Sequence, residues 1–253
     1  MLQTRVIQPA DGAYQYPLLI KRLLMSGGRY EKTREIVYRD HSRYSYLTLN
    51  ERICRLANVL TQAGVKAGDT VAVMDWDSHR YLECMFAIPM IGAVIHTINV
   101  RLSPDQILFT MNHAEDKFVL VNKEFLPLYK CFESKLTTVE KTLLITDTQD
   151  TSADLPNLVG EYETLLAAAS PTYRFEDFDE NSVATTFYTT GTTGNPKGVY
   201  FTHRQLVLHT MAVATIMGSV EGMLGGDKVY MPITPMFHVH AWGVPYAATM
   251  LGA

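Results

Sequence analysis

Cysteine is scarce in this sequence. The chain of 253 residues contains three cysteines, Cys54, Cys84 and Cys131, and no two of them form a CxxC pair. An odd number at such wide spacing indicates neither a disulfide framework nor a cysteine metal site. Unpaired thiols are typical of a reducing compartment, so we expect a cytoplasmic protein.

An excess of positive charge and long apolar runs are also lacking. The sequence has 22 Lys and Arg against 26 Asp and Glu, a formal charge of -4, and a nucleic-acid-binding surface would need a basic patch. Residues 1–16 lack the basic and apolar segments of a signal peptide. No uninterrupted apolar stretch approaches the roughly 20 residues of a spanning helix. We therefore predict no nucleic-acid partner, no export and no transmembrane segment.

Hydrophobic residues, in contrast, are plentiful. They make up 47% of the chain, enough for one large core or two smaller ones. Short β-branched runs bounded by turn residues predict strands in the first two thirds of the chain, at residues 70–74, 94–100, 118–121 and 143–146.

Helix signals lie between these runs. Thr48 and Glu51 form one capping-box pattern and Ser103 and Gln106 another, while residues 79–91 have the composition of a buried helix. Strands alternating with helices predict an α/β fold with a doubly wound, mostly parallel sheet and flanking helices. We place a boundary near residue 170, between a first α/β subdomain (1–170) and the start of a second (171–253).

One pair of acidic residues follows a predicted strand. Asp75 and Asp77 flank Trp76 directly after residues 70–74. A doubly wound sheet presents its ligand-facing loops at such positions. Nothing else in this loop indicates catalysis, so we favour a structural role over a carboxylate pair.

A segment rich in threonine and glycine carries the clearest chemical signal. After a predicted strand at 183–188 the chain reads TTGTTGNPKG over residues 189–198. Glycines let backbone N–H groups point inward, threonines add hydroxyl groups, and a lysine supplies a charge for phosphate. Pro196 stands where a Walker A motif needs glycine, and a capping box at Thr202 and Gln205 begins the next helix only after another strand. We predict a polyphosphate-binding loop between two strands; the alternative is a mobile surface turn.

These residues carry a resemblance. Residues 188–198 resemble the signature phosphate loop of the adenylate-forming enzymes, which include acyl- and aryl-CoA synthetases, luciferases and peptide-synthetase adenylation domains. The PMFHVHAWG segment at 235–243 is similar to the next core motif of this family, most of all in bacterial medium- and long-chain fatty acyl-CoA synthetases. The NVRL segment at 99–102 also matches. The likeness covers nearly all of the chain and corresponds to the N-terminal part of such an enzyme.

The resemblance implies a set of ligands and site residues. The ligands are ATP and AMP, Mg²⁺, coenzyme A as co-substrate and a carboxylic acid. Thr189 would contact magnesium and phosphate, and His238 and Trp242 would line the acyl-adenylate site, with His238 as the catalytic residue and Trp242 at the entrance of the acyl tunnel. The residues that would enclose the β- and γ-phosphates are Thr190, Gly191, Thr192, Thr193, Gly194 and Lys197.

The residues alone leave another interpretation of the histidines open. His238 and His240 are two apart on a segment we expect to be extended, so they could share one face and bind zinc. No acidic or cysteine ligand lies nearby at a usual spacing. Core or pocket histidines are therefore the favoured interpretation.

The implied function is ATP-dependent activation of a medium- or long-chain fatty acid through acyl-AMP to acyl-CoA. An aryl-CoA ligase, an adenylation domain and a non-catalytic nucleotide-binding module stay open. Family members carry further motifs and a C-terminal lid domain beyond the equivalent of Ala253, so we expect a truncated chain or fragment that is inactive alone. The apolar residues of 16–24 suggest a contact helix for a homodimer, and peripheral membrane contact stays open.

Overall fold

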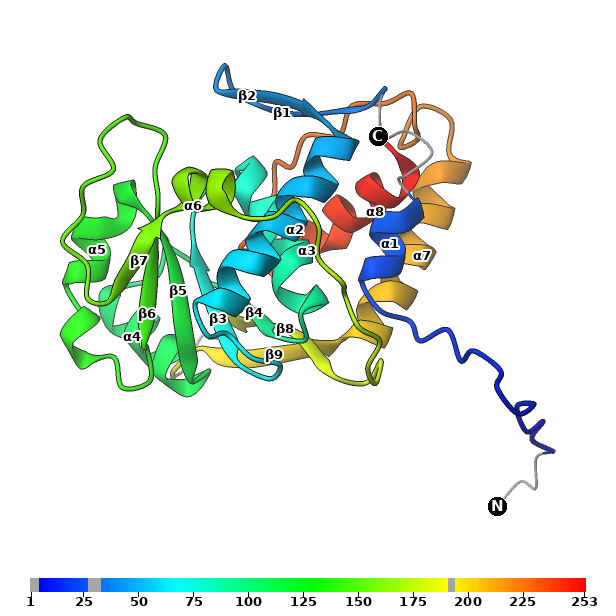
Figure 1. Ribbon diagram of the computed structural model, residues 1–253, viewed down its shortest axis with the longest axis horizontal. Coiled ribbons are helices and arrows are strands. Elements are labelled where there is room, and N and C mark those ends of the chain that lie inside the picture. The colour runs from blue at the N-terminus through cyan, green and yellow to red at the C-terminus, as the bar shows by residue number, and fades with distance from the viewer. Residues whose placement is uncertain (1–4, 27–32, 191–193) are drawn as a thin grey trace.

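A computed structural model describes residues 5–26, 33–190 and 194–253 (Figure 1). The strands are β1 (Glu35–Tyr38), β2 (Ser42–Ser45), β3 (Thr70–Met74), β4 (Val94–Thr97), β5 (Asp116–Asn122), β6 (Lys141–Ile145), β7 (Leu158–Glu161), β8 (Val183–Thr189) and β9 (Lys197–Thr202). The α-helices are α1 (Lys21–Ser26), α2 (Tyr46–Gln62), α3 (His79–Met90), α4 (Pro104–His113), α5 (Leu126–Lys130), α6 (Tyr162–Ala168), α7 (His203–Ser219) and α8 (Val244–Leu251). Short 3-10 turns are η2 (Lys123–Phe125), η3 (Glu133–Lys135) and η4 (Val239–Gly243).

Seven of these strands form one sheet in the order β7-β6-β5-β3-β4-β8-β9. All neighbours are parallel except β8 and β9, which are antiparallel. The chain passes from β3 through α3 to β4, then through α4 back past β3 to β5. Because right-handed crossovers in opposite directions use opposite faces, helices flank both sides of the sheet. The predicted doubly wound, mostly parallel α/β fold is confirmed.

The core lies between the central strands and α2 and α3. The central strands are continuous apolar runs, as expected where helices cover both faces of a parallel sheet; the side chains of Val71 to Met74 in β3 are fully buried. Nearly every residue of α3 is buried, so this helix is apolar on all sides. At one end, α1, α7 and α8 lie side by side (Figure 1).

Two predicted boundaries are wrong. The N-cap of α2 is Ser45, whose hydroxyl accepts the N–H of Thr48, so the expected capping box at Thr48 and Glu51 does not form. The helix begins earlier because Tyr46 and Leu49 are buried in the core. Strand β4 ends at Thr97, where its pairing with β3 and β8 ends, so the expected extension to residue 100 is absent.

The N-terminal segment packs on its own chain. Leu19, Ile20, Leu23 and Leu24 of the segment 16–24 are buried in the core, and α1 contacts α8. These apolar side chains therefore already have intramolecular partners, and self-association through this segment stays a prediction. In the described residues, no helix has the length and apolar character needed to cross a membrane.

The predicted boundary near residue 170 lies between α6 and β8. Residues on both sides of it contribute to the same sheet, since β8 pairs with β4 over Ile95–Thr185 to Thr97–Phe187. A division into two subdomains at this point stays a prediction.

Candidate nucleotide-binding site

The threonine- and glycine-rich segment connects two antiparallel strands. Thr189 at the end of β8 pairs with Lys197 at the start of β9, so the loop leaves and re-enters the sheet at one point. Thr189, Thr190, Gly194 and Lys197 are all exposed there. Gly194 has φ +87°, a left-handed conformation that favours glycine. The site candidates Gly191, Thr192 and Thr193 lie outside the described residues.

The loop lies at the carboxyl edge of the parallel strands. Thr97, the last residue of β4, pairs with Phe187 of the parallel strand β8, and Thr189 lies two residues further along. The loop that follows β4 therefore leaves the sheet at the same edge as Thr189. In open α/β sheets this edge is where ligands bind.

The second predicted motif is attached to the same edge. The carboxylate of Asp77, just after β3, accepts the backbone N–H of Met236 at 2.6 Å, and the hydroxyl of Thr97 donates to the carbonyl of Phe237 at 3.2 Å. His240 Nε2 is 2.5 Å from the hydroxyl of Thr185 in β8. The structure thus attaches the 235–243 segment to β8 and to the edge of the sheet where β8 ends, although Pro235 lies 37 positions after Gly198.

The 235–243 segment contains a left-handed turn. The φ angles of Val239, His240, Ala241 and Trp242 are +49°, +54°, +48° and +58°, so the expected extended conformation is wrong. A left-handed conformation costs non-glycine residues roughly 1–2 kcal/mol each, so contacts must hold this turn in place. His209 supplies one of them, since its Nε2 is 3.0 Å from the carbonyl oxygen of Trp242.

This turn separates the two histidines. His240 is 2% exposed and packs against Thr185 and the ring of Phe187. Burial lowers the pKa of His240 to about 4. His238 is exposed, and the Trp242 ring is 62% exposed. The favoured prediction of a core histidine is confirmed for His240. In the described part of the chain, no cluster of three His, Cys, Asp or Glu side chains is suited to hold a metal ion.

Asp75 and Asp77 take separate roles. The buried carboxylate of Asp75 accepts hydrogen bonds from the hydroxyl of Ser78, the amide of Asn122 and the N–H of Trp76. Burial nevertheless raises its pKa to about 6. Because Asp77 bonds to the 235–243 segment instead, the two carboxylates organise different loops, as the structural interpretation predicted.

A network at the base of the β8–β9 hairpin was not predicted. The Nδ1 of His113, at the end of α4, is 2.7 Å from the hydroxyl of Tyr188, the residue before Thr189. The ring of His96 lies 5.2 Å from that of Tyr188, and its Nδ1 is 2.8 Å from the carboxylate of Asp116. Burial raises the pKa of Tyr188 well above its ordinary value, so the hydroxyl keeps its proton. Sequence patterns gave no signal for this contact, because its partners are 75 residues apart.

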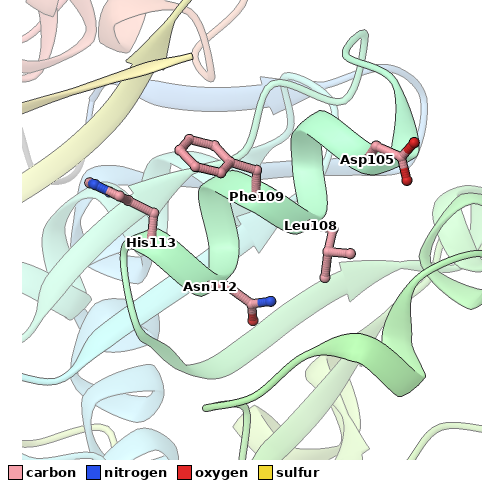
Figure 2. A pocket seen from close by; sticks show the side chains of 5 residues that line it. All are labelled: Asp105, Leu108, Phe109, Asn112 and His113. Carbon is pink, nitrogen blue, oxygen red and sulfur yellow. The ribbon is translucent and has the colours of Figure 1, made fainter. Parts of the chain in front are cut away.

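A groove of about 500 Å³ runs beside this network along α4. Figure 2 shows its lining, with Phe109 and His113 on one side of the helix. The full lining is Asp105, Leu108, Phe109, Asn112 and His113. His113 therefore belongs both to the groove and to the base of the 189–197 loop.

Comparisons with known proteins identify the relatives of this chain. The model of the AMP-binding enzyme family matches residues 26–253. The chain is 39% identical over 93% of its length to a medium-chain-fatty-acid CoA ligase of Ectopseudomonas oleovorans. It is 37% identical over 94% of its length to a 3-methylmercaptopropionyl-CoA ligase of Ruegeria pomeroyi. It spans only 43% and 44% of the lengths of these two relatives.

The fold also matches solved structures. A crystal structure of an anthranilate CoA ligase in complex with anthranoyl-AMP superimposes with a TM-score of 0.81 over 96% of this chain and 45% of that one. The sequence identity is 19%, so this likeness bears on the fold alone.

Proposed function

The chain belongs to the AMP-binding enzyme family, and from that premise we propose that it forms the nucleotide-binding part of an ATP-dependent acyl-CoA synthetase. The proposed reaction joins a carboxylate to AMP with release of pyrophosphate, and coenzyme A then displaces AMP. The observation that carries the proposal is the loop from Thr189 to Lys197, which closes two strands at the ligand-binding edge of the sheet.

The residues of this loop suit a polyphosphate. The exposed ammonium group of Lys197 supplies a positive charge, and the exposed hydroxyls of Thr189 and Thr190 supply hydrogen-bond donors. Gly191, Thr192, Thr193 and Gly194 complete the proposed phosphate-binding segment. Held in place, such groups orient the phosphates and offset the charge that develops as the carboxylate attacks the α-phosphorus.

Magnesium fits this loop only together with the nucleotide. Mg²⁺ takes oxygen ligands and is commonly held by carboxylates plus substrate phosphates. Thr189 offers one hydroxyl, and the described residues provide no cluster of metal ligands around it. The described residues alone therefore do not make a magnesium site, and no step of the proposed mechanism is assigned to the metal.

For the acid, we propose a medium- or long-chain fatty acid. The PMFHVHAWG segment supports this choice, and so does the 39% identity to a medium-chain-fatty-acid CoA ligase. His238 and Trp242 are proposed to line the acyl-adenylate site, since both are exposed on a segment attached beside the phosphate loop. The ligase for 3-methylmercaptopropionate, at 37% identity, makes short acids the competing substrate class.

Pyrophosphate exchange tests the proposal. The longest polypeptide that the reading frame encodes is incubated with Mg·ATP, labelled pyrophosphate and one acid at a time from a panel of fatty, short, aromatic and amino acids. We expect exchange with fatty acids and its loss in the Lys197→Ala variant. Exchange with aromatic or amino acids alone would overturn the fatty-acid assignment, and no exchange with any acid would count against adenylate formation.

A further inference from the structure

Tyr188 lies at the base of the 189–197 loop and contacts both of its strands. It precedes Thr189 in β8, and its partner across the hairpin is Gly198, which follows Lys197. A Cβ atom at Gly198 would lie 3.3 Å from the Tyr188 ring, so the ring packs directly on the Gly198 backbone. The position of this ring therefore affects both ends of the loop.

Two other elements hold the ring in place. Its hydroxyl bonds to His113 in the last turn of α4, at 2.7 Å, and its face lies beside His96 of β4. The His96 ring is fixed in turn by the carboxylate of Asp116. Tyr188 is 6% exposed, and its hydroxyl interacts with His113 and also with Tyr200 of β9. The Tyr188 hydroxyl therefore makes its hydrogen bond within the protein.

We infer that Tyr188 and His113 are positioning residues that hold the exposed groups of Thr189, Thr190 and Lys197 in a geometry suited to phosphate. This inference rests on the proposed function. The hydrogen bond joins the loop to α4, an element that contributes no group to the proposed phosphate site. Without it, the hairpin base has fewer fixed contacts, and the hydroxyls of Thr189 and Thr190 and the ammonium of Lys197 are less well placed before the nucleotide binds.

A distinctive consequence follows for nucleotide preference. The loop is proposed to bind the phosphates beyond the α-phosphate, which ATP has and AMP lacks. Loss of the Tyr188–His113 hydrogen bond should therefore weaken the binding of ATP more than the binding of AMP. If the hydrogen bond had only a structural role, its loss would weaken the binding of both nucleotides equally, or would lower only the stability of the fold.

Calorimetric titration of the protein with Mg·ATP and with AMP measures this preference. We expect Tyr188→Phe, which keeps the ring and removes the hydroxyl, to lower the ratio of ATP to AMP affinity by about threefold to tenfold. His113→Ala should act in the same direction, and the double variant should lose no more than Tyr188→Phe alone. His113→Asn, which retains a polar group near the position of Nδ1, should recover part of the loss.

Tyr246→Phe is the matched control. It also removes a tyrosine hydroxyl. Tyr246 is a buried residue of α8, and its hydroxyl donates to the carbonyl of Met85 in α3 at 2.9 Å. This control should keep the ATP-to-AMP ratio of the parent protein. The inference is overturned if Tyr188→Phe leaves the ratio unchanged, changes it no more than Tyr246→Phe, or adds fully to His113→Ala.

The same titrations separate this inference from the proposed function. If the parent protein prefers ATP and Lys197→Ala removes that preference, the proposed phosphate-binding role of the loop is supported. The Tyr188 variants then test the positioning role by itself. If the parent protein does not distinguish ATP from AMP and Lys197→Ala changes nothing, the proposed function fails and the positioning role fails with it.

Discussion

At the scale of single residues, Asp75 is a carboxyl group buried at the carboxyl edge of the parallel strands. Burial raises its pKa to about 6, although Ser78 and Asn122 donate hydrogen bonds to it. The folded protein therefore holds this proton more tightly than the unfolded chain, whose aspartates have a pKa of about 3.9. The stabilising contribution is complete below about pH 4 and is lost as the pH rises through about 6.

Asp75→Asn should remove this pH dependence. We expect the free energy of unfolding of the parent protein, relative to the variant, to fall by on the order of 2 kcal/mol between pH 4 and 6.5. Urea denaturation of both proteins across this range measures the difference. The absolute stability of the variant is not the readout, because the asparagine changes the bonds to Ser78 and Asn122. Parallel curves for the two proteins would contradict the prediction.

Trp242 presents its ring to solvent while its backbone is held by His209. Because we propose that this ring borders the acyl chain and does not touch phosphate, Trp242→Ala should change the choice of acid. We expect the ratio of kcat/KM for a sixteen-carbon over an eight-carbon acid to change by at least about fivefold, with the KM for ATP within about twofold. Steady-state kinetics of the longest encoded polypeptide test this. An equal loss for both acids with a raised KM for ATP would indicate a nucleotide role.

At the scale of elements, local signals were predicted well and long-range ones were not. The capping boxes at Ser103 and Thr202 both form as the sequence indicated, because their partners lie three residues apart. The start of α2 was misplaced because burial of Tyr46 and Leu49 outweighed a capping pattern. Neither β4–β8 pairing nor the Tyr188–His113 bond has a local signal, since each joins residues far apart in the chain.

The left-handed turn of η4 is another feature that depends on contacts between residues far apart in the sequence. Val239 and Trp242 have no preference for positive φ, so the sequence predicted an extended segment. Tertiary contacts with Thr185, Phe187 and His209 define the turn instead. The motifs drew attention to this segment, but the burial of His240 and the exposure of Trp242 follow only from this turn.

The capping box of α7 gives an element-scale prediction. Thr202 accepts the N–H of Gln205 at 3.2 Å, and the Gln205 side chain accepts the N–H of Thr202 at 2.9 Å. Thr202→Ala should lower the free energy of unfolding by about 1 kcal/mol, because the first turn loses a partner for its N–H groups. We expect a fall in Tm of about 2–4 °C by thermal denaturation. Thr202→Ser keeps the hydroxyl and should retain most of the stability; an equal fall in both variants would contradict a capping role.

At the scale of the whole molecule, the doubly wound sheet accounts for the meeting of distant motifs. Parallel strands end at one edge, so the residues after β3, β4 and β8 come together whatever their separation in sequence. Asp77 and Thr97 then bond the 235–243 segment to that edge. The alternation of predicted strands and helices was enough to predict this fold class, but the strand order needed the structure.

The share of the relatives that this chain spans leads to a prediction about activity. More than half of the medium-chain-fatty-acid CoA ligase has no counterpart in these 253 residues, since the match covers 43% of that protein. In the described residues, the loop groups Thr189, Thr190 and Lys197 are exposed, without a cluster of metal ligands beside them. Loss of one preorganised charge-stabilising donor lowers a rate by about 10²- to 10³-fold.

We therefore expect the purified 253-residue chain to form acyl-CoA at least about 10²-fold more slowly than the full-length Ectopseudomonas relative under the same conditions. Binding of Mg·ATP should persist and should weaken in Lys197→Ala, because the loop donors are carried by β8 and β9. The assay follows acyl-CoA from a fatty acid with ATP and, separately, from supplied acyl-AMP, with the mass of the chain verified before and after. Turnover comparable to the relative, and well above the Lys197→Ala background, would show that these 253 residues hold the whole catalytic apparatus.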